Sequence, residues 1–266
     1  MKSLTLLSWN INSIRIRLDL LKEICKEIKP DVICLQETKV IDELFPIDYI
    51  KNELGLYHIC FRGNKGYNGV AILSKLPFIE LTDKELNKKE ARDIAVKIED
   101  IEIHNLYVPA GGPIPDVENN PKFAQKLKFF EDLNKWTYDN IDSNKGKALF
   151  VGDLNIAPLE TDVWSHKQLL KEVSHTPIEI ELMTKWFITN NLIDLPRIFI
   201  PNDQKLYSWW SYRNKDYKKS NRGRRLDHAF STILLKNQVK SAYYLHKTRE
   251  IQQTSDHVPL IITLNY

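Results

Sequence analysis

Short apolar runs separated by polar turns mark most of the chain. Leu4–Trp9, Asp31–Gln36 and Gly69–Leu73 have the length and apolar content that are typical of buried strands. On the same grounds we predict further strands at Leu56–Phe61, Ile94–Ile98, Ile101–Val108, Ala148–Val151, Leu226–Thr232 and Pro259–Leu264. The runs on either side of Glu99 and Asp100 form a candidate hairpin.

Other stretches repeat their apolar residues with the spacing of a helix. This pattern predicts helices over Arg15–Ile28, Lys122–Asp139 and Thr176–Asn190. The segment Pro109–Pro121 is rich in proline and glycine, so we expect a loop there that is long enough to have a function. Glu160–Glu172 is expected to form a loop and a short helix over the candidate site described below.

The order of these elements predicts an α/β protein with two packed mixed β-sheets flanked by helices. Strict alternation of strands and helices, which a parallel doubly wound fold needs, is missing, and the sequence has no glycine-rich nucleotide-binding fingerprint. It also has neither a low-complexity tract nor a convincing linker. We therefore expect one domain over residues 1–266.

Composition and charge narrow the possible classes only slightly. The apolar fraction of 42% is ordinary for a globular protein, and a net charge of +3 means that an anion-binding surface must come from clustered cations. Cys25, Cys34 and Cys60 have no metal-binding or redox spacing, and Cys34 is expected to be buried. Because no apolar run has the length of a membrane span or a signal-peptide core, we expect a cytoplasmic protein that does not bind membranes.

Polar residues stand directly after several of the predicted strands. In Ala148–Pro158 the apolar residues are followed by Gly152, a typical turn residue, and then by Asp153 and Asn155. Sheet ends commonly hold catalytic groups because the strands below keep them rigid. Other polar residues also lie at strand edges: Asn10 and Glu37 follow their strands, Tyr107 and Asp227 lie near the end and the start of theirs, and Asp256 and His257 come just before the last strand.

Part of this set is suited to binding a metal ion and activating water. Glu37, Asp256 and the amide of Asn10 offer oxygen ligands of the kind that Mg²⁺ or Mn²⁺ prefers. Asp153 is suited to orient and deprotonate a water molecule that Asn155 holds in place. Such a combination is what phosphoryl chemistry uses.

The rest of the set is suited to stabilising negative charge. His257 can donate a hydrogen bond to a phosphate oxygen if Asp227 orients it, and Tyr107 can donate to charge that develops in the transition state. The chain lacks a Cys/His cluster for zinc and a Gly-x-Ser-x-Gly nucleophile, which argues against zinc and serine hydrolases.

Each of these residues also has a purely structural interpretation, and only their joint placement favours a site. The alternatives are an Asx turn for Asp153 and Asn155, a turn for Asn10, a helix cap for Glu37, a core position for Tyr107 and an ion pair with Arg224 or Arg225 for Asp227.

Seven segments in register carry a resemblance to a known family. They are SWNINSIR (8–15), LQETK (35–39), NGVAILSK (68–75), NLYVPAGG (105–112), VGDLNIAP (151–158), RGRRLDHAFS (222–231) and SDHVPL (255–260). In this order they resemble the exonuclease III family of abasic-site endonucleases, over nearly the whole chain.

The resemblance implies a four-layer α/β sandwich of the DNase I-like type. It also implies a divalent-metal phosphodiesterase of the exodeoxyribonuclease III or AP endonuclease kind, which acts on duplex DNA in base-excision repair. Such enzymes cut 5′ to abasic sites, and several also have 3′→5′ exonuclease, 3′-phosphatase and 3′-end repair activity. Relatives usually act as monomers.

Roles for individual residues follow from their positions in the matching motifs. Glu37 resembles the main metal ligand, with Asn10 and Asp256 nearby, and the implied metal contacts extend to Asp153 and Asn155. Asp153 resembles the general base, with Asn155 as its neighbour. His257 and Asp227 resemble the His–carboxylate pair that stabilises the phosphate. Tyr107 resembles the active-site tyrosine.

Contacts to DNA are expected from cations and aromatic residues in or near the matching loops. Trp209 is expected to line the pocket for an extruded abasic sugar, while Trp210 is expected to pack in the core. Lys218 and Lys219, like Lys215, are expected to be ordinary surface charges. The expected DNA-binding residues are Arg15, Lys39, Lys65, Tyr67, Arg92, Trp209, Arg213, Arg222 and Arg224.

The chain departs from the family pattern at a few positions. Ala110 stands where relatives often carry Asn or Gln, which removes a phosphate contact, and Ser13 stands where Gly is common. Asn12 replaces an Asp of some relatives, which weakens the case for a second metal ion. Arg224 takes a place near the sugar pocket that is often apolar or aromatic, and so bears on the balance of activities.

Two other functions remain open at this point. One is a phosphoesterase of the same fold with another substrate, such as an inositol polyphosphate or a sphingomyelin. The other is a catalytically inactive DNA-binding relative. The motif LQETK, Trp209 and the basic loops argue against the first, and the full set of catalytic side chains argues against the second.

Overall fold

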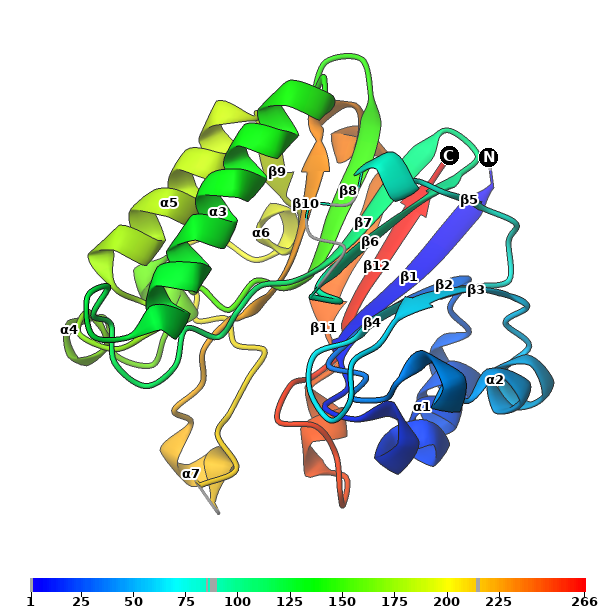
Figure 1. Cartoon of the computed structure of the whole chain (residues 1–266), viewed down its shortest axis with the longest axis horizontal. Coiled ribbons are helices and arrows are strands. Elements are labelled where there is room, and N and C mark those ends of the chain that lie inside the picture. Colours follow the sequence, from blue (N-terminus) through cyan, green and yellow to red (C-terminus); the bar gives the residue numbers. More distant parts are fainter. Residues whose placement is uncertain (1, 85, 87–89, 214–215) are drawn as a thin grey trace.

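Two six-stranded sheets pack face to face and helices cover their outer surfaces (Figure 1). The computed structural model describes residues 2–84, 86, 90–213 and 216–266. One sheet has the order β11-β12-β1-β2-β4-β3, and the other has the order β5-β6-β7-β8-β10-β9. Their bounds are Ser3–Asn10 (β1), Val32–Gln36 (β2), His58–Arg62 (β3), Val70–Ser74 (β4), Ile79–Glu80 (β5), Asp93–Ile98 (β6), Ile101–Tyr107 (β7), Lys147–Asp153 (β8), Leu192–Asp194 (β9), Asp227–Thr232 (β10), Val239–Tyr244 (β11) and Leu260–Asn265 (β12).

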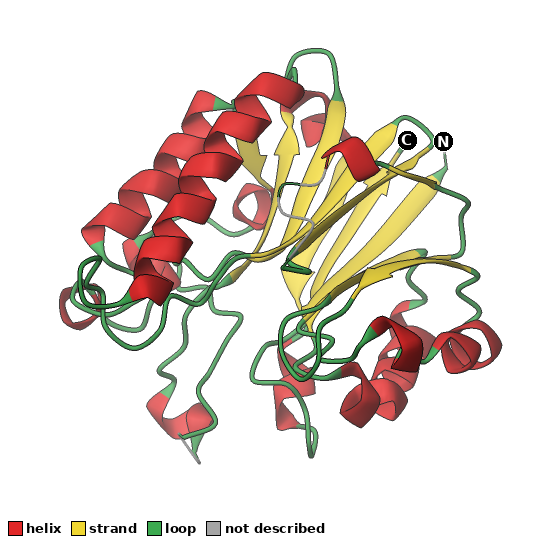
Figure 2. Cartoon of the chain, viewed as in Figure 1, coloured by secondary structure: helices red, strands yellow, loops and turns green. Residues whose placement is uncertain are grey.

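The longer helices form the two outer layers (Figure 2). In Figure 1, α3 and α5 lie together over the sheet that contains β8, whereas α1 and α2 lie on the far side of the sheet that contains β2. Their bounds are Ile14–Ile28 (α1), Ile47–Leu54 (α2), Pro121–Asn140 (α3), His166–Leu169 (α4), Pro177–Thr189 (α5), Leu195–Phe199 (α6) and Tyr217–Ser220 (α7). This arrangement confirms the predicted four-layer α/β sandwich.

Local sequence signals explain where the long helices begin. The side chain of Asn120 accepts the N–H of Lys122 at the start of α3, and Pro121 occupies the first helical position. At the start of α5, Thr176 and Glu179 form a capping box in which each side chain accepts a backbone N–H of the other residue. The three helices predicted from the sequence agree with α1, α3 and α5 to within one residue at each end.

The facing sides of the two sheets share one apolar cluster. It contains Leu6 and Ile72 from the first sheet, and Val96, Leu149 and Val151 from the second. Since both sheets bury the same cluster, the strand ends on either side of it are held at fixed relative positions.

A single domain over residues 1–266 stays a prediction. Within the described residues, no helix combines the length and the apolarity that crossing a membrane requires.

The structure also corrects the sequence analysis. Strand β11 and the short elements α2, β5, β9, α6 and α7 were not predicted. The strand predicted at Leu56–Phe61 begins later, at His58. Gly152 is not a turn residue: it lies inside β8, where it is paired with Leu106 on one side and His228 on the other.

Gly152 occupies a position that tolerates no side chain. Its φ is +136°, and a Cβ atom would lie 1.9 Å from the carbonyl oxygen of Leu106. We expect Gly152→Ala to lower the free energy of unfolding by about 2–4 kcal/mol, because a backbone clash in a central strand cannot relax cheaply. Urea unfolding of the variant measures this loss. Gly146→Ala, in a surface turn without a positive φ, is the control, and a loss of equal size there would contradict the explanation.

The strands that were predicted to end in polar residues finish at one edge of the sandwich. β1 and β2 are parallel neighbours, and so are β7 and β8, so each pair ends on the same side. The termini lie at the opposite edge (Figure 1), where Lys2 and Tyr266 exchange two backbone hydrogen bonds.

Candidate active site

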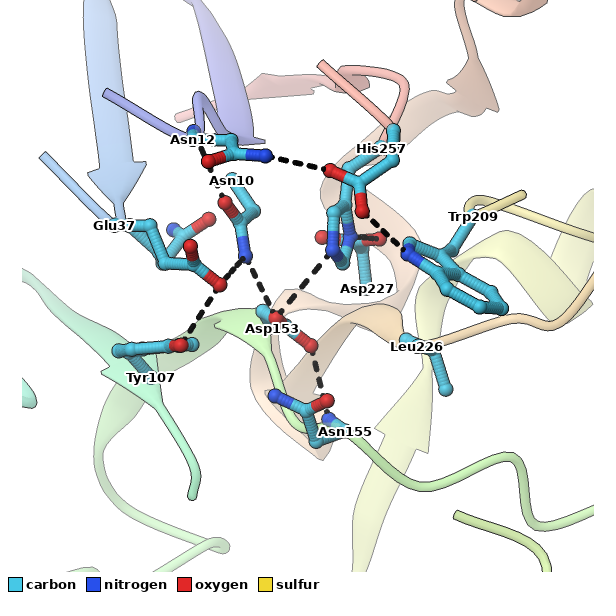
Figure 3. A network of polar contacts seen from close by, with 12 residues as sticks. Asn10, Asn12, Glu37, Tyr107, Asp153, Asn155, Trp209, Leu226, Asp227 and His257 are labelled. Carbon is cyan, nitrogen blue, oxygen red and sulfur yellow. Dashed lines mark hydrogen bonds and ion pairs between the residues drawn. The ribbon is translucent and has the colours of Figure 1, made fainter. Parts of the chain in front are cut away.

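The polar residues at the strand ends converge into one network that bridges the two sheets (Figure 3). Tyr107, Asp153 and Asp227 come from neighbouring strands of one sheet, in which Asp153 is paired with both of the others. Asn10 ends β1 of the other sheet, and Glu37 directly follows β2. The site therefore spans the edge at which the two sheets meet.

Asn10 lies between two carboxylates. Its Nδ2 donates to Oε1 of Glu37 at 3.0 Å and to Oδ2 of Asp153 at 2.8 Å. Its Oδ1 accepts the backbone N–H of Asn12 at 3.1 Å, so the alternative of a turn also describes a real contact. In this arrangement the amide nitrogen, and not the oxygen that would bind a cation, faces the carboxylates.

Glu37 is the most heavily bonded carboxylate on its side of the site. Tyr107 donates its hydroxyl to Oε1 at 2.7 Å, and Nζ of Lys39 lies 2.7 Å from Oε2. Burial opposes its ionisation, but Lys39 and the Asn10 amide together hold the pKa of Glu37 below its ordinary value. The backbone φ of Glu37 is +52°, a conformation that is uncommon outside glycine and asparagine and often marks functional sites. The side chain caps no described helix, so the capping alternative is wrong.

Asp153 is almost completely buried, with an exposed fraction of 1%. Its Oδ1 accepts the backbone N–H of Asn155 at 3.0 Å, which is the contact of the Asx-turn alternative. Burial raises the pKa of Asp153 to about 7, with nearby Asp227 and Glu37 adding to the rise and His257 opposing it. The side chain of Asn155 donates to the carbonyl of Val108 at 3.0 Å and so ties the turn to the end of β7.

His257 and Asp227 form a buried pair. Nδ1 of His257 lies 2.8 Å from Oδ2 of Asp227, and its Nε2 lies 3.8 Å from Oδ2 of Asp153. Burial opposes a charge on the ring, but Asp227 and Asp153 raise the pKa of His257 to about 10. These three residues also form a group of potential metal ligands among the described residues. Arg225 pairs with Asp162 and Asp194, so the alternative of an ion pair between Asp227 and an arginine is wrong.

Asp256 lies at the rim beside His257. It accepts hydrogen bonds from Nδ2 of Asn12 at 3.0 Å and from Nε1 of Trp209 at 2.9 Å. Asn12 also accepts from Nζ of Lys39 at 2.6 Å. Asn12 was considered above only as a departure from the family pattern. Its position two residues after Asn10 is the signal that could have placed it in the site.

Arg17 was missed altogether. Its side chain is nearly buried and donates to the carbonyl of Gln253 at 2.9 Å, to the carbonyl of Thr254 at 3.1 Å and to the hydroxyl of Tyr212 at 3.0 Å. It also donates to the carbonyl of Asn12. These contacts hold the segment that precedes Asp256 and His257 against the start of α1, and no local sequence pattern indicates them.

Two cavities flank the network. One, of about 570 Å³, is lined among others by Trp164, Trp209, Arg213, Arg222 and Arg224, together with residues of Glu160–Glu172 as predicted. The other, of about 680 Å³, is lined among others by Tyr67, Arg92, Tyr107, Ala110 and Lys122. Several predicted DNA-binding residues thus line hollows on opposite sides of the buried carboxylates.

The other cations differ in their surroundings. Arg15, Lys65 and Arg222 are exposed, and Arg92 lies over the ring of Tyr107. Lys39, which stays a predicted DNA-binding residue, is bonded to Glu37 and Asn12 within the site. Lys218 pairs with Glu250 on the surface, where Lys219 is exposed too, while Lys215 lies outside the described residues.

The two neighbouring tryptophans have the different surroundings that were expected. Trp210 is buried in the apolar core, whereas Trp209 is half-buried and bonded to Asp256. Arg224 covers the ring of Trp209 at 5.7 Å, and its Nη1 donates to the carbonyl of Val173 and to Oγ of Ser174, both at 2.7 Å. The wall of this cavity is therefore partly cationic.

Comparison with known proteins agrees with the geometry. A family model described as the endonuclease/exonuclease/phosphatase family matches residues 7–257. Exodeoxyribonuclease III of Haemophilus influenzae is 32% identical over 267 residues, which cover 96% of this chain and 97% of that protein.

Solved structures agree as well. An AP endonuclease from Archaeoglobus fulgidus matches with a TM-score of 0.89 and 31% identity, covering 99% of this chain and 100% of that one. A 3′-5′ exonuclease from Neisseria meningitidis matches with a TM-score of 0.86 and 25% identity, covering 99% and 100% of the two chains. The resemblance seen in the sequence is confirmed, and the chain belongs to the endonuclease/exonuclease/phosphatase family.

Proposed function

We propose that the protein is a divalent-metal-dependent DNA phosphodiesterase of base-excision repair. It cleaves duplex DNA on the 5′ side of abasic sites and also removes nucleotides and blocking groups from 3′ ends. The observation that carries this proposal is the network in which Glu37, Asp153 and the His257–Asp227 pair meet at the edge shared by both sheets. The names of the similar proteins from Haemophilus influenzae and Archaeoglobus fulgidus support the same reaction class.

The residues divide into groups that activate water and groups that bind the phosphate. Asp153 accepts the proton of the attacking water, and Asn155 keeps the turn that carries it in place. His257, charged and oriented by Asp227, donates from Nε2 to a non-bridging phosphate oxygen. Tyr107 donates its hydroxyl to Glu37, and the same hydroxyl would donate to charge that develops on the phosphate in the transition state.

The donor set on the Glu37 side suits a hard divalent cation. Glu37 supplies the carboxylate and Asp256 a second one, with Asp153 and Asn155 adjacent. The Asn10 amide oxygen accepts the N–H of Asn12 in this structure, so it would reach the cation only after the side-chain amide turns over. When bound, Mg²⁺ or Mn²⁺ supplies charge that stabilises the phosphate and the leaving oxygen. Nζ of Lys39 lies 2.7 Å from Oε2 of Glu37, so this carboxylate already has a positively charged partner beside the proposed metal site.

The proposed partner is duplex DNA with an abasic site or a blocked 3′ end. The two flanking cavities support this, since each combines cations with an aromatic ring beside the reaction centre. Arg15, Lys65 and Arg222 are exposed and would contact phosphates without regard to sequence. We propose that the protein acts as a monomer in the cytoplasm.

The decisive experiment uses a duplex that carries one abasic site and a second, undamaged duplex with recessed 3′ ends. We expect cleavage on the 5′ side of the lesion with Mg²⁺ and none with EDTA, and the second duplex measures the accompanying exonuclease activity. Failure to cut either duplex, in a folded protein whose melting temperature responds to Mg²⁺, would overturn DNA as the substrate and favour another phosphoesterase. Binding of DNA without any metal-dependent turnover would instead identify an inactive relative.

Trp209 offers a test of the pocket beside the reaction centre. We expect Trp209→Ala to reduce cutting at abasic sites about 10-fold and exonuclease activity much less, because loss of a stacking and packing surface costs about 1–3 kcal/mol. The rates on the two duplexes, measured for the same preparation, give the comparison. Tyr138→Ala, an exposed aromatic residue on α3, is the control. Equal losses of both activities would assign Trp209 to structural support of Asp256.

A further inference from the structure

A lysine and a glutamate form a buried ion pair behind the turn that carries Asp153. Lys126 of α3 and Glu179 of α5 are both 0% exposed, and Nζ of the lysine lies 2.5 Å from Oε1 of the glutamate. Burying two charges is costly because both lose their hydration, and apolar side chains of similar volume often give equal or higher stability. Stability alone therefore does not explain the pair.

Lys126 contacts the segments that follow two strands of the site. Its Nζ donates to the backbone carbonyl of Asn155 at 2.7 Å and to that of Ala110 at 3.4 Å. Gly111 is packed so closely that a Cβ atom there would lie 2.9 Å from Cδ of Lys126. One ammonium group thus joins the turn that begins at Asp153, the last residue of β8, to the loop after β7.

Glu179 extends these connections to the wall of the cavity beside Trp209. Both of its carboxylate oxygens accept the N–H of Ser174 at 2.9 Å, and Oε2 also accepts the N–H and hydroxyl of Thr176 at 3.0 and 2.7 Å. The hydroxyl of Ser174 in turn accepts a hydrogen bond from Arg224, which covers the ring of Trp209. The two charges therefore connect the segments around the reaction centre.

The turn that Lys126 holds is anchored from several sides. Asn155 has a φ of +54°, a left-handed conformation that asparagine adopts readily, and it turns the chain away from Asp153. Its neighbour Leu154 donates its N–H to the carbonyl of Leu226 at 2.9 Å, and the Asn155 side chain donates to Val108. Among these anchors, Lys126 is the charged donor, and a charge-assisted hydrogen bond is stronger than a neutral one.

We propose that the Lys126–Glu179 pair is a positioning device for the reaction, which fixes the Asp153–Asn155 turn relative to the loop after β7 and to the cavity wall beside Trp209. Lys126 touches none of the reacting atoms and is a positioning residue. The inference rests on the proposed function, because the reaction that it serves is DNA cleavage. A displacement of about 1 Å at a reacting group costs about 100-fold in rate, so loss of the pair lowers kcat and leaves the KM for DNA nearly unchanged.

The test replaces Lys126 with methionine, which keeps the unbranched side chain up to the ε position and removes the charged ammonium group. We expect Lys126→Met to lower kcat at least about 10-fold with KM within about threefold of the wild type. Hydrogen exchange of the backbone amides of residues 153–157 should also be about 10-fold faster, a readout that needs no substrate. Leu133→Ala, in the apolar part of α3, is the control: it should lower the melting temperature and leave kcat and that exchange unchanged.

Each remaining outcome decides the question. If Lys126→Met does not fold, the double variant Lys126→Met with Glu179→Gln removes both charges together and is measured in the same way. A folded variant with unchanged kcat and unchanged exchange would overturn the proposal, as would an equal loss of kcat in Leu133→Ala at a matched loss of melting temperature. If the wild type does not cleave DNA, the proposed function fails, and the exchange rates still decide whether the pair holds the turn.

Discussion

Replacing Asp153 with asparagine is expected to lower the rate of DNA incision by about 10²–10⁴-fold while the affinity for DNA stays nearly unchanged. The substitution removes the group that accepts the proton of water. It also places an amide where Asn10 and the Asn155 N–H donate hydrogen bonds to the two carboxylate oxygens at 2.8 and 3.0 Å, so one of the two donors would face an NH2 group that cannot accept. The exposed cations that would contact DNA phosphates are untouched.

The measurement compares single-turnover incision with binding of the same duplex in EDTA. Asp132→Asn makes the same chemical change at a partly exposed position on α3, where the carboxylate pairs with Lys128, and should leave both quantities unchanged. Incision by Asp153→Asn within about threefold of the wild type would remove Asp153 from its role as general base. A parallel loss of DNA binding would indicate instead that the substitution disrupts the whole network around Asp153.

A second large effect is expected for Glu37→Gln. We expect the incision rate at fixed Mg²⁺ to fall about 10–100-fold and the Mg²⁺ concentration for half-maximal activity to rise. The side chain accepts from Tyr107 at 2.7 Å and from Asn10 at 3.0 Å and pairs with Lys39 at 2.7 Å, so glutamine keeps the volume but loses the charge that these groups surround.

A titration of incision rate against Mg²⁺ gives the shift in metal requirement. The rise of the melting temperature with Mg²⁺ gives the same information without any substrate, because a cation that binds only the folded protein stabilises it. Glu53→Gln, at the surface of α2 and paired with Lys22, is the matched control. An unchanged titration in Glu37→Gln would mean that another group is the main ligand.

Much of the fold follows from local sequence because its central strands are continuous apolar runs. β2, β4 and β8 are buried along most of their length, so every residue in them contributes to the signal. β11 was missed because only some positions of Val239–Tyr244 are buried, and its place at a sheet edge depends on pairing with β12. β5 and β9 are too short to form a pattern at all.

The site was predictable where a residue follows its own strand, and not where its partner comes from elsewhere in the chain. Asp153 could be found because β8 leads directly to it. The hydrogen bonds from Arg17 to the carbonyls of Gln253 and Thr254 span more than 200 positions, and nothing near Arg17 encodes them. The bond of Lys39 to Asn12 could not be predicted for the same reason, since it arises only when β1 and β2 lie side by side.

The crowding of carboxylates in the site sets folding against function. The pKa of Asp153 rises from 3.8 to about 7 on folding, so the folded state loses stability as the pH increases between these values. At neutral pH the protein is therefore less stable than it would be without the buried carboxyl group of Asp153. The same carboxylates raise the pKa of His257 to about 10, so the charge that costs stability at Asp153 stabilises the charged imidazole beside it.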